Sequence, residues 1–293
     1  ARMCCAALGT DTLASIRLPA AYCGVVGLKA THGLASIRNI IPVAESLDHV
    51  GPLTRTIADA ALMLQAMAGF DPQDPVSTQA PYQSYSAALT RDVVNLRIGM
   101  PDKVYFDNLD ADIEKVSATA VNELIRLTGS VGEVTLPEVP DFSMLLAESV
   151  VWHEAYLRDP ASRQLYDPAT LVRLDAAANV SAADYIRVRH DMIRVRNRIE
   201  EVFETIDVLI TPTTPNLPET IAGAINPLEA AGAEPSVRNT APFNLYGIPT
   251  VSIPIGFSAS GLPIGLQLSS SRLREDHLFA LGAAYQQLST WHL

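Results

Sequence analysis

The sequence predicts an α/β fold built around one sheet. Two kinds of hydrophobic pattern alternate along its 293 residues. In one, apolar residues recur at helical spacing; in the other, short continuous apolar runs are bounded by Pro or Gly. Continuous runs are typical of strands buried on both faces, and strands interspersed with long helices favour an α/β architecture. Because no low-complexity linker interrupts the pattern, we expect a single domain over residues 1–293.

Four helices are expected. Thr56 and Asp59 resemble a capping-box start for a helix that ends near Gly69. Helical spacing also predicts helices over residues 111–128, 182–206 and 275–288. In the helix at 182–206 we expect one buried stripe and a solvated, ion-paired opposite face that carries the arginines. The predicted stripe consists of Ile186, Ile193, Ile199, Val202, Phe203 and Ile206, and the predicted solvated arginines are Arg187, Arg189, Arg194, Arg196 and Arg198.

Strands are expected at residues 96–100, 131–136, 208–211, 250–253 and 265–268, of which the last three read as apolar strands buried on both faces. Residues 71–90 are rich in Asp, Pro, Gln and Ser and indicate a surface connection. The first eight residues are small and apolar, so they predict an interior strand or helix.

Composition excludes several function classes. Lys and Arg total 21 against 32 Asp and Glu, a net charge of −11, so a basic nucleic-acid-binding surface is not expected. No apolar run reaches the roughly 18–20 residues of a membrane span, and no signal peptide is evident. Cys4, Cys5 and Cys23 have no metal-ligand spacing, so we expect reduced thiols in a cytoplasmic protein with no metal and no cofactor.

Residues 9–20, Gly-Thr-Asp-Thr-Leu-Ala-Ser-Ile-Arg-Leu-Pro-Ala, carry the clearest chemical signal. Short polar side chains crowd between an apolar run and Pro19, which indicates a loop or a tight turn. Ser15 on such a turn is a candidate nucleophile, although a serine needs a base and an oxyanion-binding group to act as one. Without further information, a hydroxyl that caps a turn is the commoner role.

This segment resembles the central motif of the amidase signature family, Gly-Ser/Thr-Asp-Thr-Gly-Gly-Ser-Ile-Arg-x-Pro-Ala. The resemblance continues through residues 21–33, through Ser46-Leu47-Asp48 and through Gly51-Pro52. Two later blocks, residues 207–215 and 244–267, also resemble the family and occur in the same order. The chain is therefore identified as similar to this family over nearly its whole length.

The resemblance implies a mixed sheet with helices on both faces and the hydrolysis or transfer of amide bonds by a Ser–cis-Ser–Lys triad. It implies that Ser15 is the nucleophile and that the backbone N–H groups of Thr12, Leu13 and Ala14 form the oxyanion hole. Backbone donors suit this role because they are in place before charge develops on the carbonyl oxygen. Asp11 and Arg17 match motif positions expected to support the loop.

The chain departs from the family pattern in two ways. The family's lysine and bridging serine precede the motif, and fourteen residues precede Ser15 here, so we expect a chain that lacks the N-terminal part carrying them. Lys29 belongs to the block after the motif and is expected to be structural. Leu13 and Ala14 replace the family's two glycines, and a side chain at either position could narrow the oxyanion hole.

Three hypotheses follow. The first is a hydrolase of small-molecule amides, and of some esters, that acts through a serine acyl-enzyme. The second is an amidotransferase A-type subunit that works with a tRNA-binding partner. The third is a non-catalytic remnant that binds ligands or partners; uncovered apolar surface would then favour self-association. A Ser-His-Asp arrangement with His32, His49, His153 or His190 is disfavoured, and His32 and His49 are its strongest candidates because they flank the motif block.

Overall fold

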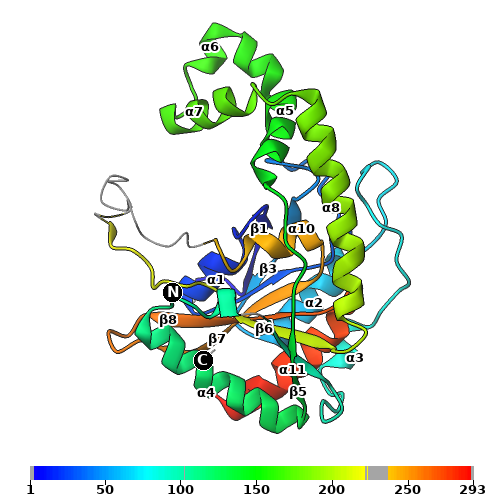
Figure 1. The fold of residues 1–293 in the computed structure, drawn as a ribbon, viewed down its shortest axis with the longest axis vertical. Coiled ribbons are helices and arrows are strands. Elements are labelled where there is room, and N and C mark those ends of the chain that lie inside the picture. Colours follow the sequence, from blue (N-terminus) through cyan, green and yellow to red (C-terminus); the bar gives the residue numbers. More distant parts are fainter. Residues whose placement is uncertain (1–2, 102, 222, 224–236, 292–293) are drawn as a thin grey trace.

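The computed structural model describes residues 3–101, 103–221, 223 and 237–291. Its centre is an eight-stranded sheet in the order β1-β3-β2-β7-β8-β6-β4-β5 (Figure 1). β4 is parallel to β5 and β6, and the other pairs are antiparallel, so the sheet is mixed, as expected. The strands are β1 (Ala6–Asp11), β2 (Val26–Lys29), β3 (His49–Thr54), β4 (Ile98–Pro101), β5 (Val131–Val134), β6 (Val208–Pro212), β7 (Thr250–Phe257) and β8 (Pro263–Ser269).

Helices cover both faces of the sheet. On one face, α2 (Ile57–Met67), α3 (Tyr85–Ala88), α4 (Ala111–Thr128) and α11 (Glu275–Leu288) pack against the strands in the largest apolar cluster. On the other face lie α1 (Arg17–Cys23), the C-terminal half of α8 (Ala182–Val202) and α10 (Ala241–Tyr246). The predicted α/β fold with helices on both faces is confirmed.

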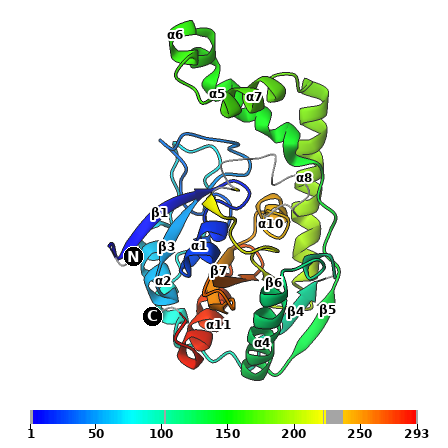
Figure 2. The same cartoon turned by 90° about the vertical axis from the view of Figure 1, so that its left-hand side faces the viewer.

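Three helices form an extension that projects away from the sheet (Figures 1 and 2). They are α5 (Ala147–Arg158), α6 (Pro160–Arg163) and α7 (Pro168–Ala177), and α8 returns from them to the sheet. Two short 3₁₀ helices, η1 (Lys103–Tyr105) and η2 (Phe142–Leu146), complete the regular structure described between β4 and α5.

Most of the predicted elements are present. α4 and α11 have the predicted bounds. α2 begins after Thr56, whose hydroxyl accepts the N–H of Asp59 as the N-cap. The predicted strands at 208–211, 250–253 and 265–268 are the buried strands β6, β7 and β8, which are central in the sheet.

Two expectations about burial are wrong. In α8, Ile186 and Ile193 are each 51% exposed, while Ile199 is buried as predicted, together with Val188, Met192 and Val195. Phe203 and Ile206, which follow α8, are buried as predicted. Arg196 faces the protein, because its guanidinium donates to the carbonyl oxygens of Leu245 and Ser46 at 2.9 and 2.7 Å. The first residues are also not interior: β1 is an edge strand on which Leu8 is 63% exposed.

Within the described residues, no helix combines the length and apolar character needed to cross a bilayer. The same residues contain no group of three or more His, Cys, Asp or Glu side chains able to hold a metal ion. The three cysteines are exposed and unpaired.

Candidate active site

The turn of residues 12–16 joins β1 to α1 and presents Ser15 to solvent. Before Ser15, Ala14 is buried at 4% exposure and Leu13 is half-buried. The turn lies close to β2 because position 27 is glycine. A Cβ at Gly27 would lie 2.8 Å from the carbonyl oxygen of Ile16, so a larger residue would push the turn away from the sheet.

Asp11 organises the turn from the end of β1. Its Oδ2 accepts the backbone N–H groups of Ile16 and Arg17 at 3.2 and 3.4 Å, which satisfies donors at the start of α1. The same carboxylate accepts Nε and Nη2 of Arg17 at 3.0 and 3.1 Å. Burial alone would raise the pKa of Asp11, but the attraction of Arg17, assisted by Lys29 and Asn244, lowers it below its usual value.

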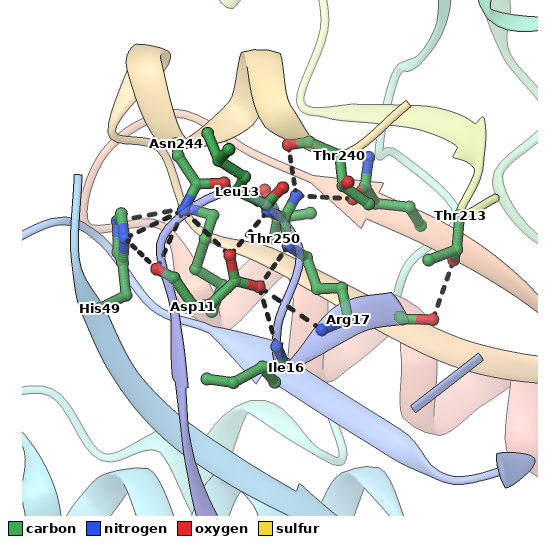
Figure 3. Close-up of polar contacts among 12 residues, drawn as sticks. Asp11, Leu13, Ile16, Arg17, His49, Thr213, Thr240, Asn244 and Thr250 are labelled. Carbon is green, nitrogen blue, oxygen red and sulfur yellow. Dashed lines mark hydrogen bonds and ion pairs between the residues drawn. The ribbon is translucent and has the colours of Figure 1, made fainter. Parts of the chain in front are cut away.

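Arg17 connects the turn to α10 and β8, two distant parts of the chain (Figure 3). Its side chain is fully buried, and Nη1 donates to the carbonyl oxygen of Thr240 and to Oε1 of Gln267, both at 2.9 Å. Nη2 donates to Oδ1 of Asn244 and, at 3.2 Å, to the carbonyl oxygen of Leu13. The guanidinium therefore holds the turn against the Thr240 loop, α10 and β8 at once.

Asn244 of α10 closes this network. Its Nδ2 donates to the carbonyl oxygen and Oδ1 of Asp11, both at 3.0 Å, and to the carbonyl oxygen of Leu47 at 3.3 Å. Because these groups are buried and charge-assisted, they fix the position of the turn more firmly than surface contacts would.

The turn leaves a set of donors unpaired. The backbone N–H groups of Thr12, Leu13, Ala14 and Ser15 donate to no other described residue, and Ser15 Oγ likewise has no hydrogen-bond partner among them. Adjacent N–H groups without a protein partner, beside an exposed hydroxyl, can bind a ligand oxygen.

The residues that replace the family's two glycines do not strain the turn. The described non-glycine residues with positive φ are Asn39, Asn108 and Leu273, so Leu13 and Ala14 adopt backbone angles open to any residue. The Leu13 side chain packs against a buried apolar cluster of Ala44, Leu47, Leu145, Val188, Met192 and Leu245.

Lys29 at the end of β2, His32 in the turn that follows and His49 at the start of β3 form a buried group. Lys29 Nζ donates to the carbonyl oxygen of Ile248 at 2.6 Å and lies 3.4 Å from His49 Nε2. His49 Nδ1 lies 2.6 Å from the carbonyl oxygen of Leu47, which places the proton of the neutral ring on Nδ1. Burial lowers the pKa of Lys29 well below its usual value, and burial together with Arg196 lowers the pKa of His32 to about 3.

These side chains bond main-chain carbonyl oxygens; His32 Nε2, for example, lies 3.1 Å from the carbonyl oxygen of Glu45. The rings of His32 and His49 stack edge to face at 5.2 Å between centroids. In the described chain, none of the three reaches Ser15 Oγ. His153 bonds Tyr166 in the extension at 2.6 Å.

Two cavities lie beside α5, one against residues 37–42 and the other against Glu45 and Ser46. One, of about 460 Å³, is lined by residues 37–42, by residues 73–75 and by Trp152 of α5. The other, of about 570 Å³, is lined by Ser46, Glu148, Trp152 and Arg189, among others. Glu45, Pro75 and Trp152 line both cavities, so the two cavities are neighbours.

Sequence reasoning named Asp11, Arg17 and the turn, but it assigned no role to the residues that hold them. Asp48, Asn244 and Gln267 each lie in a block that resembles the family, which was the available signal. Their contacts join positions as far as 250 residues apart, so spacing could not reveal them. The buried hydroxyl pair of Thr213 and Ser252, 2.8 Å apart, was also missed.

The family model described as Amidase matches residues 1–279. The chain belongs to the amidase family. An amidase of Pseudomonas putida is 36% identical over 302 residues, covering 99% of this chain and 64% of that protein. The A-type subunit of glutamyl-tRNA(Gln) amidotransferase from a Cyanothece species is 34% identical over 313 residues, covering 98% and 64%. The family resemblance inferred from the motifs is thus confirmed.

Solved structures agree with this assignment. Peptide amidase from Stenotrophomonas maltophilia superimposes with a TM-score of 0.76 at 29% identity, covering 97% of this chain and 62% of that one. The A-type subunit of glutamyl-tRNA(Gln) amidotransferase from Thermotoga maritima gives a TM-score of 0.78 at 29% identity, covering 98% and 63%. This amidase-family chain spans about 64% of the length of the curated relatives named above.

Proposed function

We propose that the chain carries the nucleophile and the oxyanion site of an amide hydrolase. Ser15 Oγ attacks the carbonyl carbon of a small-molecule amide, and the C–N bond then breaks to release ammonia or an amine. Water next attacks the ester between Ser15 and the acyl group, which releases the carboxylic acid and restores the hydroxyl. Certain esters would be cleaved by the same two steps.

The observation that carries this proposal is the set of free N–H groups of Thr12, Leu13 and Ala14 beside the exposed Ser15. The buried Asp11–Arg17 pair keeps these donors in place before charge develops on the substrate. Removing one preorganised donor of this kind lowers the rate by roughly 10²–10³-fold.

The proton of Ser15 needs an acceptor, and we propose that it is not Lys29, His32 or His49, since each is engaged elsewhere. The resemblance to the family implies a bridging serine and a lysine that precede the motif. Asp11 and Arg17 are proposed as supporting residues because their contacts hold the turn and leave no free proton to exchange with a substrate.

A second candidate function is that of an amidotransferase A-type subunit. It rests on the 34% identity to one such subunit of a glutamyl-tRNA(Gln) amidotransferase and on the TM-score of 0.78 to another. In that case the chain would release ammonia from an amide donor for a partner that binds tRNA, and it would copurify with that partner.

For the rest of the molecule we propose a cytoplasmic location, supported by the three exposed, unpaired cysteines, and a single domain over residues 1–293. Self-association is proposed through the open edge of β1, where Leu8 is exposed.

A fluorophosphonate probe tests the main proposal on the natural polypeptide. We expect the probe to label one peptide, the one that contains Ser15, and we expect p-nitroacetanilide hydrolysis to fall by roughly 10⁴-fold or more in Ser15→Ala. Ser260→Ala, a change at an exposed serine of the β7–β8 turn, is the matched control and should keep the wild-type rate. If Ser15 took no label, and if Ser15→Ala and Ser260→Ala hydrolysed the substrate at the same rate, the proposed catalytic role would be wrong and the non-catalytic hypothesis would be favoured.

A further inference from the structure

A single buried contact fixes Thr12, the first residue of the turn. Thr12 Oγ1 donates to Asp48 Oδ1 at 2.5 Å, and the two residues are only 9% and 5% exposed. β1 and β3 are antiparallel with Asp11 opposite His49, so Thr12 and Asp48 face each other one position beyond the last pair of the ladder. The contact therefore continues the pairing of β1 with β3 by one more residue, into the turn.

The other oxygen of Asp48 is used in a different way. Asp48 Oδ2 accepts the backbone N–H groups of Val43 and Ala44 at 2.9 and 3.1 Å. The N–H groups of Leu47 and Asp48 in turn donate to the carbonyl oxygen of Ala44, both at 2.8 Å. One carboxylate thus closes the loop of residues 43–48 on itself and binds the turn of residues 12–16 to that loop.

The loop is anchored on its far side as well. The N–H of Ser46 donates to Glu148 Oε2 of α5 at 2.9 Å, and the carbonyl oxygen of Ser46 accepts Arg196 of α8 at 2.7 Å. Since the loop is held to two helices, a hydrogen bond from Thr12 to Asp48 attaches the turn to a rigid partner.

We propose that Asp48 is a positioning residue for the oxyanion site. By holding the Thr12 hydroxyl, Asp48 sets the orientation of the peptide units at residues 12–14 so that their N–H groups converge on the substrate oxygen. Small errors in such a site are costly, because an oxyanion donor acts only when it already points at the developing charge. This inference rests on the proposed role of the turn in amide hydrolysis.

The electrostatics of Asp48 support this assignment. Burial raises the pKa of Asp48 to about 6, and repulsion from Glu148, the charged group that faces it from α5, adds to the effect. The hydrogen bonds from Thr12, Val43 and Ala44 oppose the rise. A carboxylate kept in surroundings that disfavour its charge is typical of a group retained for its role and not for stability.

The test uses the rate of fluorophosphonate labelling at Ser15, because the phosphoryl oxygen of the probe occupies the oxyanion site. Thr12→Val keeps the shape of the side chain and removes the donor, and Asp48→Asn keeps an acceptor and removes the charge. We expect labelling to slow by roughly 10- to 100-fold in either variant, less than for the outright loss of a donor. Thr12→Ser keeps the hydroxyl and should be labelled at close to the wild-type rate.

The matched controls are Thr56→Val and Asp59→Asn, which break a contact of the same chemistry at the start of α2, where Thr56 Oγ1 donates to Asp59 Oδ2 at 2.7 Å. They should lower the melting temperature without changing the labelling rate. In the double variant Thr12→Val/Asp48→Asn the two losses of rate should be less than multiplicative, because both changes affect the Thr12–Asp48 contact.

The pH profile separates positioning from a general loss of stability. The labelling rate of the wild type should fall as pH decreases through about 6, where Asp48 takes up a proton. The labelling rate of Asp48→Asn should not show this decrease. A wild type that is labelled at Ser15 while Thr12→Val and Asp48→Asn react at its rate would overturn this inference alone. A wild type that takes no label would overturn the proposed function, and this inference with it.

Discussion

Arg17 and Asp11 form a bidentate ion pair in which neither side chain is exposed to solvent. The guanidinium also satisfies Thr240, Gln267, Asn244 and the carbonyl oxygen of Leu13. These partners lie in the turn itself, at α10 and on β8, so the pair links three parts of the chain and supports the turn that carries Ser15.

Arg17→Met should therefore be strongly destabilising. It leaves the Asp11 carboxylate buried without its cation, a change that costs about 3–5 kcal/mol in buried pairs. Urea unfolding measures the effect, and Arg38→Met is the control, since the Arg38–Asp71 pair is partly exposed and ion pairs of this kind contribute little to stability. Equal losses of stability in the two variants would contradict this role for the Arg17–Asp11 pair.

Leu13→Gly, which restores one family glycine, should not speed acylation of Ser15. Leu13 has an ordinary backbone conformation and packs into an apolar cluster, so its removal should reduce the free energy of unfolding by about 1–2 kcal/mol. Labelling rates and urea unfolding of Leu13→Gly, Ala14→Gly and the double variant measure both effects. A tenfold faster label in the double variant would show instead that the Leu13 side chain narrows the oxyanion hole.

The stability contributed by Asp48 should decrease as pH rises. Burial raises its pKa from 3.8 to about 6 in the folded protein, so the folded state binds this proton more tightly than the unfolded chain. The contribution is fully present below about pH 4 and is lost as pH rises through about 6. Asp48→Asn does not titrate there, so the unfolding free energy of the wild type relative to this variant should fall by on the order of 2–3 kcal/mol between about pH 4 and pH 7. A constant difference would contradict the raised pKa.

Lys29 should show the opposite dependence. Burial lowers its pKa well below 10.5, so its contribution to stability is fully present above about that pH and is lost as pH falls toward the lowered value. The unfolding free energy of the wild type relative to Lys29→Met should therefore decrease from about pH 10 to about pH 7. Labelling of Ser15 should persist in Lys29→Met; complete loss of label in a folded variant would make Lys29 the base.

The elements themselves could be predicted where local signals agree. α4 and α11 occupy the predicted residues because each has apolar residues at helical spacing, and Thr56 marked the start of α2 as its N-cap. The central strands were recognised because burial on both faces requires continuous apolar runs.

The orientation of α8 could not be predicted in the same way. Its isoleucines suggested one face, but Ile186 and Ile193 lie outside, and Arg196 turns inward because two main-chain carbonyl oxygens from distant segments accept its guanidinium. Periodicity assigns a charged residue to solvent by default and carries no information on such partners. For the same reason the roles of Asn244 and Gln267 could not be predicted, because their buried amides bond residues that are distant in the sequence.

Arg196 also ties together two segments that never touch the reacting bond. Its guanidinium binds the carbonyl oxygens of Ser46, two residues before Asp48, and of Leu245, the neighbour of Asn244. The long helix α8 therefore holds both segments that contact the turn of residues 12–16. In a selection for altered substrate preference, we therefore expect beneficial substitutions in α8, remote from Ser15, that shift this helix by a fraction of an ångström.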